Sequence, residues 1–180
     1  FYRGVKDENE IGKFLNPDYE KGQHDPFLMK DMDKAVERIL RAIKDNEKIV
    51  IYGDYDVDGI TSTAILLKFF SLLNKDVGFY IPHRVEEGYS LSLQAIEKFK
   101  KERINLIITV DCGINNVKEI EQAVNSNIDV IVTDHHEPGE ILPNAYAIIN
   151  PKLNNSTYPF KHLSGAGVVF KLVSALIEKM

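Results

Sequence analysis

The sequence predicts an α/β fold built on a mainly parallel sheet of five strands, with helices on both faces. The first indication is a series of short runs rich in Val and Ile, which is typical of strands buried on both faces of a sheet. The second is that amphipathic stretches separate these runs, and such alternation implies parallel strands joined by right-handed crossovers. The third is size, because 180 residues with 44% hydrophobic and 27% charged residues suit one globular domain.

The expected elements follow one another in a regular order. Strands are expected at residues 48–52, 77–82, 105–110, 128–132 and 145–149, with helices between them at 60–73, 91–102 and 117–126. A further helix over residues 31–46 precedes the first strand, because its apolar residues fall on one face. A final helix is expected where apolar residues repeat at helical spacing from Val168 to Ile177.

The two ends of the chain are expected to differ from this core. Residues before 30 are mixed and loop-like, so we divide the chain into an N-terminal extension over residues 1–30 and a domain over residues 31–180. The chain starts with Phe1 and stops while the last helical pattern continues, which indicates a piece of a longer protein.

Composition excludes several classes of protein. The longest run without Asp, Glu, Lys or Arg extends from Ile141 to Pro151, far short of the about 20 apolar residues of a membrane span. The net charge of −5 means that any binding to nucleic acid must come from a local patch. Cys112 is the only cysteine, which predicts a reducing, cytoplasmic setting and favours a buried side chain over a nucleophile.

Acidic and histidine side chains gather directly after the predicted strands. This position is informative because open parallel α/β sheets bind their ligands at the carboxyl ends of the strands. In chain order, the residues that follow the first four strands are Asp54, Asp56 and Asp58, then His83 and Arg84, then Asp111, and finally Asp134, His135, His136 and Glu137. The sequence therefore predicts a functional site at this edge of the sheet.

Asp54, Asp56 and Asp58 alternate along the chain, so an extended segment would aim all three carboxylates at one point. Clustered carboxylates are destabilising unless they are protonated or bind cations, which predicts a metal site. A calcium EF-hand is excluded, because the twelfth loop position needs a Glu and here holds Ile65. An aspartyl-phosphate phosphatase and a solvated acidic turn both stay open from these residues alone.

His135 and His136 are adjacent, and we expect their side chains to diverge. One is then expected to ligate a metal ion and the other to face a substrate. The alternative that both are ordinary loop residues that bind no ligand stays open. Imidazole together with carboxylates favours Mn²⁺ or a similar metal over Ca²⁺. Asp111 lies between the richer clusters and is either a helix N-cap or a bridge between two ions.

Three ordered motifs resemble those of the DHH phosphoesterase superfamily, at residues 51–59 (IYGDYDVDG), 110–114 (VDCGI) and 132–136 (VTDHH). Further segments resemble the RecJ-type exonucleases, which are specific for single-stranded DNA and digest it 5′→3′; they lie at residues 31–36, 81–84, 87–89, 150–151 and 163–171. The resemblance covers nearly the whole chain. It implies a Rossmann-like DHH domain and a phosphodiester hydrolase that uses two Mn²⁺ or Mg²⁺ ions.

The resemblance also implies a role for each matching residue. Asp56 would hold the first ion and Asp58 the second, Asp111 would bridge the two ions, and His135 would ligate the second. His136 would contact the scissile phosphate, Asp134 would orient its neighbours, and Asp54 would be a further ligand or hold a water molecule.

Four residues are weaker candidates for substrate contacts. Arg84, beside His83, offers a fork of N–H groups to phosphate, although it could equally pair with nearby glutamates. Ser164 and Gly165 open a helix whose N–H groups could bind an anion, although close helix packing explains the glycine as well.

Two departures from the family pattern matter. Tyr52 occupies a position where some members have a His, which leaves the shell of the first ion open. The family's fourth motif, which supplies another Asp ligand, and its smaller C-terminal domain would both lie beyond Met180. We therefore expect this chain to carry most of the metal site and to have little or no nuclease activity.

Two rival functions stay open at this stage. One is another DHH hydrolase, acting on oligoribonucleotides, cyclic dinucleotides or pyrophosphate, and the other is a DHH scaffold without catalysis. The expected partner is single-stranded DNA, and the expected role is in DNA repair and recombination. No association with a membrane is expected. A single-strand-binding protein and a helicase are partners implied by the resemblance alone.

Overall fold

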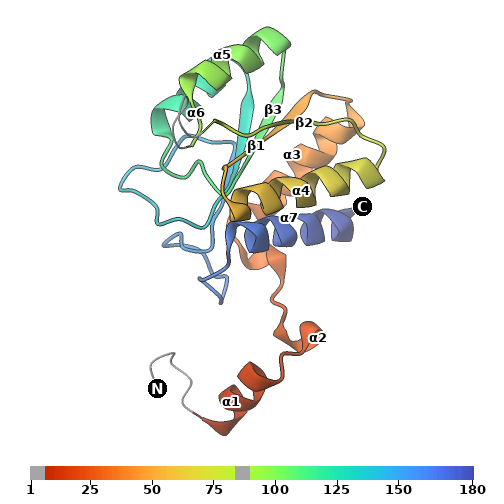
Figure 1. The fold of residues 1–180 in the computed structure, drawn as a ribbon, viewed down its shortest axis with the longest axis vertical. Coiled ribbons are helices and arrows are strands. Elements are labelled where there is room, and N and C mark those ends of the chain that lie inside the picture. The colour runs from red at the N-terminus through yellow and green to blue at the C-terminus, as the bar shows by residue number, and fades with distance from the viewer. Residues whose placement is uncertain (1–6, 84–89) are drawn as a thin grey trace.

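The computed structural model describes residues 7–83 and 90–180 and shows a five-stranded sheet between two layers of helices (Figure 1). The sheet order is β2-β1-β3-β4-β5 and every strand pair is parallel, which confirms the expected fold class. The strands are β1 (Ile49–Gly53), β2 (Gly78–Tyr80), β3 (Leu106–Val110), β4 (Asp129–Thr133) and β5 (Ala147–Ile149).

Alternating side chains of the strands divide the hydrophobic core into two clusters. Helices α3 (Met32–Lys44), α4 (Val57–Leu72) and α7 (Gly165–Lys179) pack on one face of the sheet. Helices α5 (Leu93–Glu102) and α6 (Val117–Asn125) pack on the other face, as Figure 1 shows. Consecutive strand residues point to opposite faces, so both layers are built from the same short apolar runs. No helix in the described ranges is long and apolar enough to cross a bilayer.

The direction in which the chain adds strands to the sheet reverses between β1 and β3. The chain leaves β1 through α4 to reach β2 on one side, and α5 then carries it back to β3 on the other side of β1. The loops that follow β1 and β3 therefore diverge, and such a switch point leaves a crevice in which ligands of α/β proteins bind. Helices α4 and α7 both begin at this edge and lie against each other.

Two expectations about local structure are wrong. The N-terminal extension is not loop-like throughout, because Asp7 caps α1 (Glu8–Leu15) and a short α2 (Tyr19–Gly22) follows. Helix α4 begins at Val57 rather than near residue 60, because the Asp56 carboxylate accepts the N–H groups of Asp58 and Gly59 at 2.8 and 2.9 Å. Asp54, Asp56 and Asp58 therefore do not form the extended, alternating segment that the sequence suggested.

The edge strand β5 is closed by a side chain from the start of α3. Asp31 Oδ2 accepts the outward N–H of Ile148 at 3.1 Å, so a backbone donor of the sheet edge is satisfied. Asp31 itself is in the left-handed backbone region with φ of 60°, where Asp and Asn are better tolerated than other side chains.

We predict that Asp31→Ala destabilises the fold by about 2 kcal/mol, because it leaves the N–H of Ile148 without an acceptor and puts Ala in a strained conformation. Asp31→Asn, which keeps an acceptor oxygen and tolerates the same φ, should cost less than half as much. Urea unfolding of the two variants measures the difference, and equal losses would contradict this role of Asp31.

Candidate metal centre

Asp111 is the buried centre of the site. It follows β3 directly, is 1% exposed, and has φ of 61°, a conformation held by its N–H bond to the Thr133 carbonyl at 3.0 Å. Space for its carboxylate depends on Gly165 at the start of α7, because a Cβ there would lie 2.7 Å from Asp111 Cγ. The chain thus brings a strand end and a helix start, 54 residues apart, to one carboxyl group.

Asp54 and Asp56 complete one group of carboxylates with Asp111. One oxygen atom from each of the three lies within 4.8 Å of the others. Asp54 is 2% exposed and accepts the N–H of Tyr55 at 2.7 Å. One oxygen of Asp56 caps α4, which leaves its second oxygen for this group. Three carboxylates at such distances form the oxygen-rich set that Mg²⁺ and Mn²⁺ prefer.

His135 and His136 form a second group with Asp111, again with donor atoms within 4.8 Å of one another. The expectation that the two imidazoles diverge is wrong, since their ring centroids are only 4.6 Å apart. The reason is that β4 ends at Thr133, and residues 134–136 then turn around the Asp134 carboxylate, which accepts the N–H groups of His135 and His136. The extended geometry that separates neighbouring side chains does not apply there.

Hydrogen bonds fix which nitrogen of each imidazole faces the site. Nδ1 of His135 lies 3.0 Å from the Leu163 carbonyl oxygen, which can only accept, so Nδ1 carries the proton. Nδ1 of His136 lies 2.7 Å from the Asp134 carboxylate, and the same argument applies. The Nε2 atoms are left for the site, and such outer partners are typical of histidines that ligate metals.

Asp58 stands slightly apart from both groups. Its two carboxylate oxygens accept the N–H groups of Gly165 and Ala166 at 2.6 and 2.8 Å, where α7 begins. The positive end of the helix dipole and these two donors stabilise the ionised carboxylate. One of the same oxygens is 3.7 Å from His135 Nε2, so Asp58 also borders the second group.

The electrostatics of Asp111 favour a cation beside its carboxylate. Burial, and then the negative charges of Asp58 and Asp56, raise the pKa of Asp111 to about 8. Its Oδ1 has no hydrogen bond among the described residues, yet lies 3.1 Å from Nε2 of His135. If Nδ1 holds the proton of the neutral imidazole, two electron-rich atoms face each other. A proton or a metal ion between them removes the repulsion, so the residues present fit a divalent cation.

Asp134 and His136 behave as a matched pair. Burial alone would raise the pKa of Asp134, but hydrogen bonds from the His136 ring and from the backbone N–H groups of Ile114 and His136 outweigh it and lower that pKa. The hydrogen bond to Asp134 in turn raises the pKa of His136. Burial also raises the pKa of Asp54.

The structure places the remaining predicted residues less centrally. His83 is exposed just after β2, and Arg84 lies outside the described residues. Ser164 caps α7 through the N–H of Gly167, while the N–H of Gly165 is engaged by Asp58 rather than open to another anion. Cys112 is buried as expected, and burial raises the pKa of its thiol.

Two contributors to the site were missed by sequence reasoning. Asn150, which is buried after β5, donates to the His136 carbonyl at 2.9 Å and holds that turn in place. The rule that strand ends carry functional residues could have pointed to it. The Leu163 carbonyl that orients His135 left no signal, because a backbone atom does not depend on the type of side chain.

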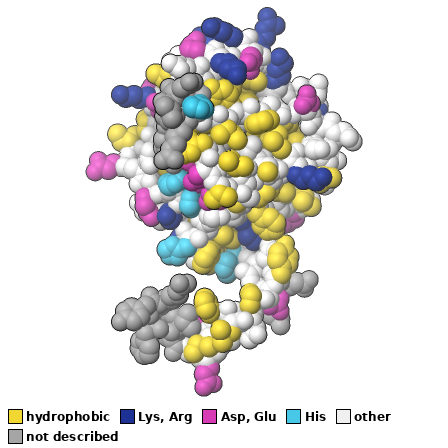
Figure 2. All heavy atoms as spheres, in the orientation of Figure 1, with side chains coloured by type: hydrophobic (Ala, Val, Ile, Leu, Met, Phe, Trp, Pro, Cys, Tyr) yellow, Lys and Arg dark blue, Asp and Glu magenta, His cyan; other side chains and the backbone are white. Residues whose placement is uncertain are grey.

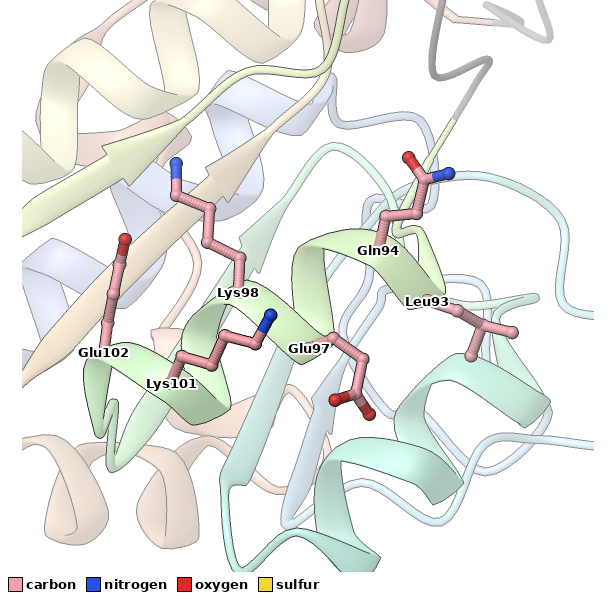
Figure 3. A pocket seen from close by; sticks show the side chains of 6 residues that line it. All are labelled: Leu93, Gln94, Glu97, Lys98, Lys101 and Glu102. Atoms are coloured by element: carbon pink, nitrogen blue, oxygen red, sulfur yellow. The ribbon is translucent and has the colours of Figure 1, made fainter.

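Figure 2 shows histidine and acidic side chains side by side at one edge of the domain, and further histidines between them and the N-terminal segment. A separate shallow hollow of about 540 Å³ lies on the outer face of α5, where all six lining side chains project from that single helix (Figure 3). None of its lining residues belongs to a loop that follows a strand, so we assign it no part in the site.

Comparison with known proteins agrees with this geometry. The DHH family, N-terminal domain, matches residues 48–180. The single-stranded-DNA-specific exonuclease RecJ of Bacillus subtilis is 51% identical over 157 residues, which make up 87% of this chain and 20% of the relative. RecJ of Escherichia coli is 39% identical, over 97% of this chain and 30% of its own length.

Solved structures give the same result. A crystal structure of exonuclease RecJ bound to manganese matches with a TM-score of 0.76 and 38% identity, over 84% of this chain and 38% of that one. RecJ from Thermus thermophilus in complex with Mn²⁺ matches with a TM-score of 0.70 and 34% identity, over 84% of this chain and 21% of that one. The chain thus spans between about a fifth and two fifths of the relatives it matches.

We predict that the pKa of His136 lies above its ordinary value of 6.5 and falls in Asp134→Asn, which NMR titration of the imidazole would show. The pair should stabilise the fold most between about pH 3.8 and 6.5. Its contribution is lost as the pH falls through the lowered pKa of Asp134, or rises through the raised pKa of His136. An unchanged His136 pKa in the variant would contradict this pairing.

We also predict that Asp111→Asn stabilises the metal-free chain. The pKa of Asp111 is raised to about 8 in the folded state, so the wild type loses stability as the pH rises from about 4 to 8, whereas the variant does not. The gap should reach a few kcal/mol at pH 8, since one pKa unit corresponds to about 1.4 kcal/mol. Urea unfolding in a chelator at pH 5 and pH 8 measures it, and a gap that shrinks with rising pH would refute the assignment.

Proposed function

The chain belongs to the DHH family, and on that premise we propose that it is the metal-binding part of an exonuclease acting on single-stranded DNA. The observation that carries the proposal is the pair of donor groups that share Asp111, at the switch point of the sheet. A shared carboxylate between two donor sets is what a two-ion phosphodiesterase requires. The ions would be Mn²⁺ or Mg²⁺, as in the manganese-bound relatives.

In this proposal Asp54 and Asp56 would hold the first ion, and Asp111 would be shared with the second. The second ion would be held by His135 and by Asp58, which borders that group, while His136 of the same group would not be a ligand. Two such ions, when bound, lower the pKa of a water molecule towards 7 and stabilise negative charge on the phosphate oxygens. The protein supplies the remaining requirement, which is a fixed geometry set by the starts of α4 and α7.

His136 is better suited to a phosphate than to a metal ion. The hydrogen bond to Asp134 raises the pKa of His136, which favours the protonated ring, and a protonated imidazole cannot ligate a metal. Its side chain is 42% exposed, compared with 27% for His135, so it can reach a substrate more readily. We therefore assign His136 to donating from Nε2 to a phosphate oxygen, with Asp134 positioning it.

Other parts of the proposal rest on the sequence and on its resemblance to the family alone. We propose a role in DNA repair and recombination in the cytoplasm, with a single-strand-binding protein and a helicase as partners of the longer protein. His83, Arg84, Ser164 and Gly165 remain candidates for contacts with the phosphate groups of a substrate. The division into an extension, residues 1–30, and a DHH domain, residues 31–180, is part of the same proposal.

The rival functions differ in what they require of the site. A scaffold without catalysis needs no buried carboxylate of raised pKa, whereas Asp111, whose Oδ1 has no hydrogen bond within the described part of the chain, costs stability unless a cation is present. Another DHH hydrolase would use the same centre on a different phosphodiester or on pyrophosphate, so only the choice of substrate separates it from the exonuclease.

We predict that this chain binds Mn²⁺ in an EPR titration and that Asp111→Asn weakens binding at least 100-fold, because both donor groups lose their shared ligand. Lys101→Gln, in the last turn of α5 near the amino ends of the strands, is the control and should bind as the wild type does. No Mn²⁺ binding at millimolar concentration would count against the proposal.

Substrate choice is tested with 5′-phosphorylated single-stranded DNA, duplex DNA of the same sequence and a cyclic dinucleotide, each with Mn²⁺. We expect slow release of nucleotides from the single strand only, and no release by Asp111→Asn. Preferential cleavage of the cyclic dinucleotide would instead establish the other DHH hydrolase.

A further inference from the structure

A second concave surface lies beside the metal centre and takes no part in the chemistry described above. It has a volume of about 570 Å³, which is within the range of small-ligand sites, and lies between residues 17–24, the loop around Phe160 and the second turn of α7. We call it the aromatic cleft, after its lining residues Tyr19, Tyr158, Phe160 and Phe170. Its polar lining residues are Asp18, Gln23, His24 and Lys171.

The aromatic cleft and the metal centre share a wall. Leu163 lines the cleft with its side chain, while its carbonyl oxygen holds Nδ1 of His135 at 3.0 Å. Phe170 follows Gly165 by five residues of α7, which is a rise of about 7.5 Å along the helix axis, and the N–H of Gly165 donates to Asp58. That distance corresponds to about two stacked nucleotides at roughly 3.4 Å each.

The walls of the cleft present aromatic side chains to solvent. Tyr19 is 70% exposed, Phe160 is 49% exposed and Phe170 is 40% exposed, although burial of such side chains is strongly favourable. The ring of Phe160 is steadied by an edge contact with His162, whose centroid is 6.0 Å away. Exposed, pre-oriented aromatic faces are the usual platform on which bases of single strands stack.

Polar groups at the base of the cleft can contact the edge of a base. Lys171 is 6% exposed, and its ammonium donates to Gln23 Oε1 and to the His24 carbonyl, each at 2.9 Å. Because Lys171 engages the amide oxygen of Gln23, the amide N–H groups point elsewhere, and they have no partner among the described residues. Base carbonyl oxygens are matching acceptors for these donors.

We propose that the aromatic cleft binds a nucleobase of the single-stranded substrate, one or two nucleotides from the phosphate held at the metal centre. The proposal rests on the proposed function, since it takes the strand to pass the metal centre. Stacking on its aromatic walls accounts for affinity without strict sequence preference. Leu163, which lines the cleft and holds His135 through its carbonyl, links occupancy of the cleft to the metal centre.

The test uses short 5′-phosphorylated oligonucleotides with phosphorothioate linkages that resist hydrolysis, each carrying 2-aminopurine at one position. Stacking quenches 2-aminopurine fluorescence, so we expect quenching at one position near the 5′ end and not at distant ones. Phe160→Ala should abolish this quenching and weaken binding about tenfold, while Phe160→Trp should retain both. Phe79→Ala is the matched control, because Phe79 is 60% exposed on β2 and lines a different depression.

An oligonucleotide with an abasic site shows whether Phe160 stacks on a base or has only a structural role. Placed at the quenched position, the abasic site should weaken wild-type binding by the same factor as Phe160→Ala, and the two changes together should add nothing further. Additive losses, an equal loss in Phe79→Ala, or no position-dependent quenching in the wild type would each overturn the proposal.

The EPR titration with Mn²⁺ reports on the metal centre without any base. Absence of Mn²⁺ binding would count against the proposed function while the binding cycle stays readable. Mn²⁺ binding together with additive losses would refute the aromatic cleft alone.

Discussion

The site depends on one buried carboxyl group that the fold cannot satisfy by itself. Asp111 is held in a left-handed conformation at the end of β3, out of contact with water and close to the carboxylates of Asp56 and Asp58. Hydrogen bonds within the chain would normally stabilise such a group, yet one of its oxygens has none among the described residues. Folding therefore maintains a position that needs a cation, and the stability lost there is recovered when the cation binds.

Two helix N-termini organise the other acidic groups around that position. Asp56 caps α4 with one oxygen, and Asp58, two residues further, is held by the first N–H groups of α7. Both arrangements use donors that a helix leaves unsatisfied, so the negative charges also stabilise the helices they orient. The two histidines have hydrogen-bond partners of different charge, because His135 faces the neutral carbonyl of Leu163 whereas His136 faces the carboxylate of Asp134. Two adjacent residues of the same type therefore have different electrostatic surroundings.

Much of the fold and the composition of the site could be predicted from the sequence. Apolar runs identified all five strands, and the position of each acidic or histidine cluster after a strand identified the edge where the site lies. Local geometry was harder to predict, because it depends on hydrogen bonds that the pattern does not show. Helix α4, which Asp56 caps, begins three residues before the expected start at residue 60. The turn around Asp134 brings together two imidazoles that an extended chain would separate.

By itself, then, the sequence determined which side chains are available and which end of the sheet they occupy, because short runs of Val and Ile and a helical period of 3.6 can be recognised without coordinates. Only the tertiary structure decided how these groups meet. The start of α7, more than a hundred residues from Asp58, orients that carboxylate and leaves room for Asp111. The aromatic cleft likewise joins residues near positions 20, 160 and 170, whose proximity follows from packing and from no local pattern.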